Sequence, residues 1–273
     1  MSMAIQWSLV LFTVLSGCGA WLFACTAADE FRGGAAAKVR MPACIAALVL
    51  LIVGGIASAT HLSHVDRIMA VLAHPTAGIF LEALLLGLLA ACIAVYAVLV
   101  KRGAASSARK VLAGAGIVLA VTFSFACGVS YMMSSRPLWN TIALPLAYLG
   151  TVAATGTALY LAMCAALKVD DAEVRNAGIY TVAGAALALA LSLAYGVASG
   201  VAFGEQAALY WAAVVLCGAV APAVCGALAA CKPDGALALG VVALAGALAG
   251  SIALRAVMWL AGVAVANYFG FAL

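Results

Sequence analysis

The sequence predicts an all-α protein that crosses a membrane as a bundle of eight helices. The first observation is composition: 68% of the 273 residues are hydrophobic and only 8% are charged, whereas soluble domains carry about 25% charged residues. The second is pattern, because the chain contains eight apolar runs that each reach the roughly 20 residues needed to cross a bilayer. Helices are expected because a helix satisfies its own backbone hydrogen bonds in lipid.

The apolar runs follow one another so closely that they form a single integral membrane domain, residues 1–273. No Lys or Arg precedes the first run, so we expect a retained first span, since a signal peptide would begin with a basic segment. The later runs are rich in Gly and Ala, which let membrane helices pack closely. The predicted helices cover residues 5–27, 42–60, 76–100, 110–133, 139–167, 176–203, 207–231 and 236–268.

The loops predict the orientation. Loops after odd-numbered helices hold ten Lys and Arg residues, whereas loops after even-numbered helices hold only Arg67 and Arg136. Because basic loops stay on the cytoplasmic side, both chain termini are predicted to lie on the outer side of the cytoplasmic membrane. The net charge of +4 is scattered over these short loops. It therefore informs topology and gives no support for nucleic-acid binding.

All three histidines lie in one stretch, SATHLSHVDRIMAVLAHPTAGIFLEALLLGLL, at residues 58–89. His61 is predicted at the outer end of the second helix, where an imidazole can donate and accept hydrogen bonds; the alternative is a polar helix end. For His64 and His74 the ordinary surface role is the preferred interpretation, and a three-histidine zinc site is the weaker alternative. No histidine lies mid-span, so haem ligation between helices is not expected.

The nine cysteines lie almost entirely inside apolar runs, and none forms a C-x-x-C pair. Metal or iron–sulfur ligation therefore has no local support. We expect these cysteines to be small packing residues.

Two ionisable residues, Glu82 and Arg255, lie well inside the predicted spans. A charge at that depth costs about 2.5–3.5 kcal/mol and is a candidate for function. Glu82 would accept a proton or a hydrogen bond in a cavity under the outer loop; alternatively it only fixes helix packing. Arg255 would neutralise Glu82 or orient a ligand oxygen; alternatively it extends toward the outer interface.

Aromatic residues gather toward the same predicted side: Tyr131, Trp139, Trp259 and Tyr268. They form either an interfacial belt or a wall for a flat ring. An imidazole, a buried carboxylate, an arginine and aromatic rings suit a quinol, which has two oxygens, a flat ring and protons to release. No residue set here holds electrons, so the acceptor is expected in another subunit.

Several segments, in order, resemble the membrane-anchor subunit of the dimethyl sulfoxide reductase family. Glu82 follows Arg67 at the same short spacing as in that family, and an arginine in the last helix is followed by aromatic residues. The segments are QWSLVLFTVLSGCGAWLFA, ASATHLSHVDRIMA, YMMSSRPLWNTIALPLAYLGT and LRAVMWLAG.

The resemblance implies a subunit without its own haem or iron–sulfur cluster. Such a subunit oxidises menaquinol near the outer face and passes the electrons to an iron–sulfur subunit, which feeds a molybdopterin catalytic subunit. It implies quinol-binding roles for His61, Glu82 and Arg67. With Arg255 these are the predicted site residues; the second rank is His64, Trp139 and Trp259.

The chain departs from the family pattern at two places. Ser63, His64 and Val65 follow the "HL" pair where the family has glycine and then proline, and Leu254 precedes Arg255 where it has glycine. These differences leave the quinone and the terminal acceptor open. The alternatives are a quinone-reactive anchor of the polysulfide or nitrite reductase type, a small-solute transporter without visible inverted repeats, and a purely structural anchor.

Overall fold

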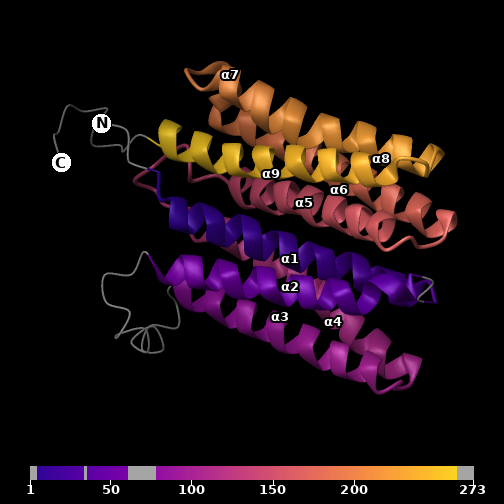
Figure 1. Ribbon diagram of the computed structural model, residues 1–273. Coiled ribbons are helices and arrows are strands. Elements are labelled where there is room, and N and C mark those ends of the chain that lie inside the picture. Colours follow the sequence, from indigo (N-terminus) through magenta and orange to yellow (C-terminus); the bar gives the residue numbers. More distant parts are fainter. Residues whose placement is uncertain (1–4, 34–35, 61–77, 263–273) are drawn as a thin grey trace, which may run out of the picture.

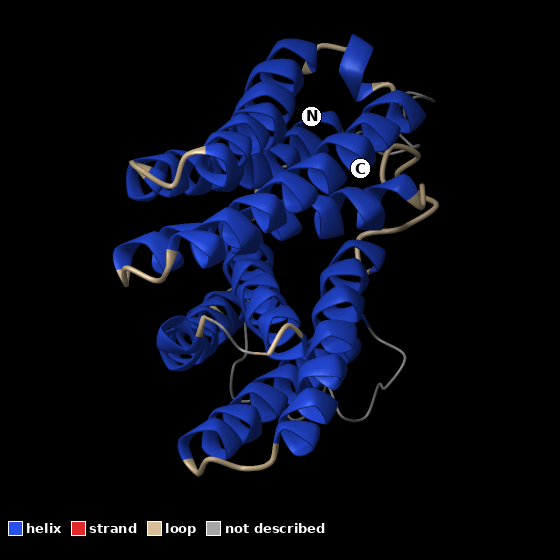
Figure 2. Ribbon diagram, turned by 90° about the vertical axis from the view of Figure 1, so that its right-hand side faces the viewer, coloured by secondary structure: helices blue, strands red, loops and turns tan. Residues whose placement is uncertain are grey.

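The computed structural model describes residues 5–33, 36–60 and 78–262. In these residues every regular element is a helix, and eight spans are long and apolar enough to cross a membrane (Figures 1 and 2). The predicted all-α bundle is confirmed. Seven spans are single helices: α1 (Trp7–Phe31), α2 (Ala37–Ala59), α3 (Gly78–Lys101), α4 (Ser106–Val129), α5 (Ala143–Ala166), α6 (Asp171–Ser199) and α9 (Ala236–Ala261).

The seventh span is composite. After the short 3-10 helix η2 (Val201–Phe203), it runs through α7 (Ala207–Leu209), the π-helix η3 (Tyr210–Val220) and α8 (Ala221–Cys231). The hydrogen-bond register returns to α-helical next to Pro222, a residue without an N–H to donate. Together these pieces cover residues 207–231, the predicted bounds.

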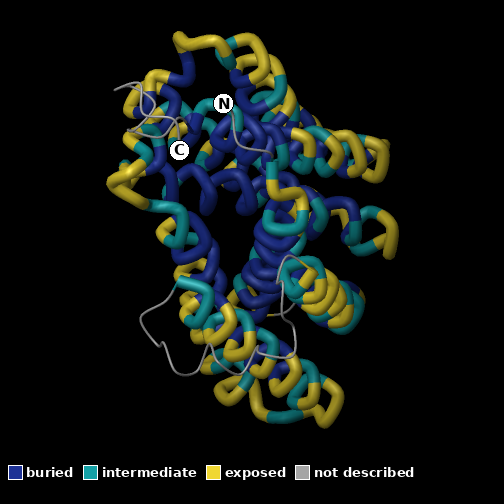
Figure 3. The backbone as a smooth tube through the Cα atoms, turned by 90° about the vertical axis from the view of Figure 1, so that its left-hand side faces the viewer, coloured by how far each residue is buried: buried dark blue, intermediate teal, exposed yellow. Residues whose placement is uncertain are grey.

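Helices α1 and α5 form the centre of the bundle. In each, 78% of the most apolar stretch is buried inside the protein, against 22% in the peripheral α3. Helix α5 contacts α1, α4, α6 and α9, and the buried backbone gathers around this centre in Figure 3. Close approach depends on small residues: a β-carbon at Gly156 would lie 2.6 Å from the backbone nitrogen of Leu22 in α1.

The two ends of the bundle differ in charge. Helix α1 begins and α9 ends at the same end (Figure 1), which we call the Trp7 end. The other end carries the loops with the ten Lys and Arg residues, and we call it the basic end.

Several predicted helix bounds were wrong: two helices extend further than predicted at the basic end, and two are shorter than predicted at the Trp7 end. At the basic end α1 ends at residue 31 instead of 27, and α6 begins at 171 instead of 176. At the Trp7 end α4 stops at 129 instead of 133, and α5 begins at 143 instead of 139. Hydropathy ended the spans at the first charged residues. At the basic end the chain continues as helix past those residues, because their charges pair with residues of other helices.

A buried ion network at the basic end supplies these partners. Glu30 in α1 is 1% exposed, and its carboxylate accepts hydrogen bonds of 2.9 Å from Arg109 Nε in α4 and from the Tyr96 hydroxyl in α3. Arg40 in α2 lies 3.5 Å from the same carboxylate and 3.9 Å from that of Asp29. Glu82 and Arg255 are therefore not the only charges inside the spans.

Candidate functional site

Four aromatic side chains form one cluster at the Trp7 end. The ring centroids of Trp139 and Trp259 lie 5.0 Å apart, and Tyr131 lies 6.3 Å from Trp139, 6.1 Å from Trp259 and 5.5 Å from Tyr148. Most contacts are edge to face, the arrangement that the ring quadrupoles favour. Trp139 is 1% and Trp259 is 4% exposed. These two rings form an internal wall, and burial excludes an interfacial belt for them.

The cluster is tied to the last helix through Met258. The indole nitrogen of Trp139 donates a 2.9 Å hydrogen bond to the Met258 carbonyl, and the Tyr148 hydroxyl lies 3.4 Å from its sulfur. The Arg136 guanidinium stacks 4.7 Å from the Trp139 ring and donates to the Gly262 carbonyl. The loop between α4 and α5 is thereby held against the end of α9.

Glu82 lies on the side of α3 that faces α4. It is 8% exposed and follows the first described residue of that helix, Gly78, by one turn. Its carboxyl group interacts with the Ser130 hydroxyl just after α4. A β-carbon at Gly78 would lie 2.7 Å from the same hydroxyl, so the glycine lets the start of α3 approach the end of α4.

Arg255 is buried between α1, α5 and α9, and its side chain points away from the nearest end of the bundle. Nε donates to Thr13 Oγ1 at 2.6 Å, and Nη1 donates to the carbonyl and hydroxyl of Ser251 at 2.9 Å and to Thr151 Oγ1 at 3.3 Å. The guanidinium lies 4.1 Å from the Tyr148 ring centroid. Since Ser251 is one turn nearer the basic end, the guanidinium does not extend toward the Trp7 end, as the alternative of an interfacial arginine would require.

Glu82 and Arg255 do not form an ion pair, so Arg255 does not neutralise Glu82 directly. Both interact electrostatically with the same three side chains, which are Cys127, Tyr131 and Tyr148. An acidic and a basic group therefore approach one aromatic cluster from α3 and from α9. This arrangement offers a proton acceptor, a cationic hydrogen-bond donor and flat apolar walls.

The structure describes four of the seven predicted site residues: Glu82, Arg255, Trp139 and Trp259. Trp139 and Trp259 are in direct contact, Arg255 lies over the Tyr148 ring of the same cluster, and Glu82 lies beside Ser130. The other three, His61, His64 and Arg67, lie outside the described residues, as do His74 and Tyr268. Sequence reasoning missed the hydroxyl partners of Arg255. Only Ser251 carried a signal, because it precedes Arg255 by four residues and so shares its helix face.

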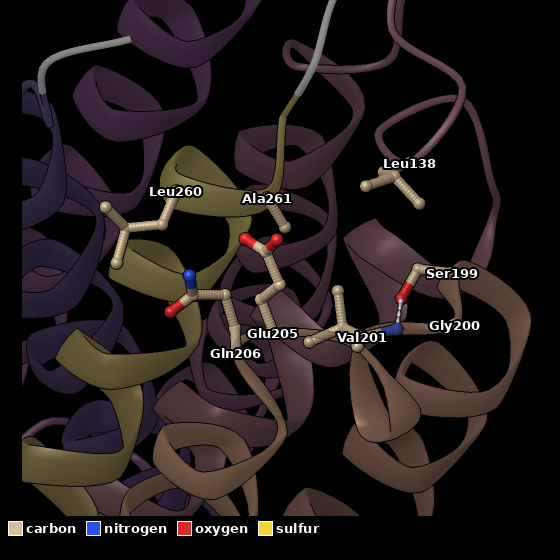
Figure 4. A pocket seen from close by; sticks show the side chains of 9 residues that line it. Leu138, Ser199, Gly200, Val201, Glu205, Gln206, Leu260 and Ala261 are labelled. Carbon is tan, nitrogen blue, oxygen red and sulfur yellow. Dashed lines mark hydrogen bonds between the residues drawn. The ribbon is translucent and has the colours of Figure 1, made fainter. Parts of the chain in front are cut away.

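A cavity of about 250 Å³ lies at the Trp7 end, and none of the four cluster residues lines it. It is lined by Leu138 and Leu260, the neighbours of Trp139 and Trp259, and by the turn after α6 (Figure 4). Glu205 in this turn is exposed. The sequence analysis did not select this acid, because a single acidic residue in a loop is ordinary.

The described part of the chain contains no group of three His, Cys, Asp or Glu side chains that would hold a metal ion. All nine cysteines are free, and seven of them are buried. Their placement agrees with a role in helix packing.

The comparison with protein families decides the membership of the chain. The family described as DMSO reductase anchor subunit (DmsC) matches residues 1–221. The chain belongs to this family. No curated protein matches the chain. The anchor subunit is thus a multi-pass membrane protein, and the matched region includes Glu82, Trp139 and most of the partners of Arg255.

Proposed function

We propose that this anchor subunit binds and oxidises menaquinol at the Trp7 end and passes the electrons to an iron–sulfur partner subunit, which feeds a molybdopterin catalytic subunit. The observation that supports the proposal is that Glu82 of α3 and Arg255 of α9 both lie near the same aromatic cluster. Membership of the reductase anchor family supports the two partners.

The chemistry of a quinol matches this set of groups. Oxidation of a quinol to a quinone releases two electrons and two protons. The Glu82 carboxylate is the base that accepts a proton, because it is the buried acid nearest the aromatic cluster. Trp139 and Trp259 offer faces for the flat ring. His61 and Arg67 follow α2 in the sequence and are proposed to complete the site, with His64 in a secondary role.

We further propose that the Trp7 end faces the outer side of the cytoplasmic membrane. The positive-inside rule supports this, because ten of the twelve basic residues in the loops lie at the basic end. The quinol site then lies near the outer face, where the electrons leave the membrane toward the partner subunits.

Cysteine labelling tests this orientation. Cys231 ends α8 at the basic end and is exposed. We expect a membrane-impermeant maleimide to label it in inverted vesicles and not in right-side-out vesicles. A cysteine introduced by Ser135→Cys, at an exposed position of the Trp7 end, is the matched control and should show the opposite pattern. The reverse outcome at both positions would place the quinol site on the cytoplasmic side.

Quinol turnover of the assembled complex tests the function. We expect vesicles containing all three subunits to couple oxidation of a menaquinol analogue to reduction of the terminal acceptor. His61→Ala should lower this turnover at least about 10-fold and leave turnover with an artificial donor to the catalytic subunit unchanged. If the unmodified complex accepts electrons from the artificial donor but not from quinol, the proposal is wrong.

A further inference from the structure

Arg255 is a buried charge without a counter-ion among the residues that the structure describes. The sequence contains nine acidic residues, and eight lie in the described part of the chain. None of the eight forms an ion pair with Arg255, whereas Arg32, Arg40 and Arg109 are all paired with acids. The ninth acid is Asp66, outside the described residues. Arg255 is 1% exposed, so water does not compensate its charge either.

The groups that hold Arg255 are neutral. Two threonine hydroxyls, one serine and one tyrosine ring surround the guanidinium. They orient it, but dipoles do not cancel a net charge, and an uncompensated buried ion destabilises the folded state. The other charged cluster, at the basic end, avoids this destabilisation by pairing each arginine with an acid. This difference between the two groups of charged residues indicates that the partner of Arg255 is a bound ligand rather than an acidic side chain.

One nitrogen of the guanidinium has no hydrogen-bond acceptor among the described residues. Hydrogen bonds within the described residues use Nε and Nη1 only, and Nη2 donates to no described residue. Arg255 also interacts electrostatically with Tyr131 and Tyr148 of the aromatic cluster. Nη2 is therefore a donor with no acceptor in the described part of the chain, and the guanidinium lies beside the aromatic cluster.

We propose that Nη2 of Arg255 binds an anionic oxygen of the ring ligand, so that the site prefers a deprotonated quinol over a neutral quinone. The inference rests on the proposed function. The bound quinol transfers one hydroxyl proton to the Glu82 carboxylate, and the resulting oxygen anion pairs with Arg255. Two electrons then leave to the iron–sulfur partner and the second hydroxyl proton is released, which produces the quinone. Thr13, Thr151 and Ser251 are positioning residues that aim the guanidinium.

The test compares two ring ligands of equal size on the assembled complex at neutral pH. A hydroxynaphthoquinone is an anion under these conditions, and the methylnaphthoquinone with the same alkyl chain is neutral. We expect the unmodified complex to bind the anion more tightly in equilibrium binding. Arg255→Gln should weaken binding of the anion about 10- to 100-fold and change binding of the neutral analogue less than about 3-fold. Arg255→Lys should retain part of the preference.

Each outcome has a distinct meaning. If the unmodified complex binds the anion no more tightly than the neutral analogue, the inference is overturned, whether or not the variants fold. Equal weakening of both analogues in Arg255→Gln also overturns it, because it indicates a purely structural arginine. If the unmodified complex binds neither analogue, the proposed quinol function itself fails.

Discussion

Replacing Glu82 with Gln should lower the rate of quinol oxidation by about 10²- to 10⁴-fold, the usual contribution of a positioned acid–base group. Gln has nearly the same shape and keeps a hydrogen-bonding side chain beside Ser130, but it accepts no proton. The quinol then has no base at the point where its first proton must leave. The chemical step should therefore suffer far more than binding.

The measurement is quinol-driven turnover, with kcat and KM for the quinol analogue determined separately. Glu205→Gln is the matched control, because it removes an acid from the same end of the bundle without touching the aromatic cluster. We expect that control to retain normal turnover. Equal rates for Glu82→Gln and the unmodified complex would show that Glu82 is not the base.

Replacing Glu30 with Gln should destabilise the anchor subunit by about 3–5 kcal/mol, the usual effect of removing one partner from a buried ion pair. Arg109 and Arg40 would each lose the carboxylate that lies 2.9 Å and 3.5 Å away. Arg109 would then have no acidic partner, and Arg40 would keep only Asp29, 3.9 Å away. We expect poor accumulation of the subunit in the membrane and a lower midpoint of thermal unfolding.

Unfolding can be followed by thiol labelling, since seven buried cysteines become reactive when the bundle opens. The matched control is Glu173→Gln, whose ionic partner Arg32 lies 3.5 Å away with its side chain 37% exposed. A pair of that kind contributes about 0–1 kcal/mol. The double variant Glu30→Gln with Arg109→Gln should recover part of the lost stability. A Glu30→Gln variant that unfolds together with the Glu173→Gln control would contradict this account.

The fold was largely predictable from the sequence. The errors in the helix bounds share one cause, which is that hydropathy does not show which parts of the chain become neighbours. Apolar runs located all eight spans, but hydropathy stopped α1 before Asp29 and Glu30. A hydropathy pattern cannot show that Arg40 in α2 and Arg109 in α4 lie close enough to pair with those acids. The same runs extended α4 and α5 into the apolar loop around Trp139, which packs on α9 rather than continuing either helix.

The candidate site was predictable as a set of residue types and not as an arrangement. Glu82 and Arg255 were selected because charge inside an apolar span is expensive. Whether Arg255 neutralised Glu82, bound a ligand or extended to the interface depended on the direction of one side chain. Its contacts with Thr13, Thr151 and Ser251 rule out an ion pair with Glu82 and an extension toward the Trp7 end. The two threonine hydroxyls lie 242 and 104 residues away in sequence, so no local pattern connected them.

The sequence by itself determined the class of the protein, the number of its spans and the charge difference between its ends, because these depend on transfer of side chains between water and lipid. It also contained the resemblance that the family comparison confirmed. Only the tertiary structure decided that Trp139 and Trp259 are an internal wall. It also showed that Asp29, Glu30 and Glu173 at the basic end pair with arginines, whereas Arg255 pairs with no acid of the described residues. The physical reason is that pairing and burial depend on which helices become neighbours, and helix packing determines that.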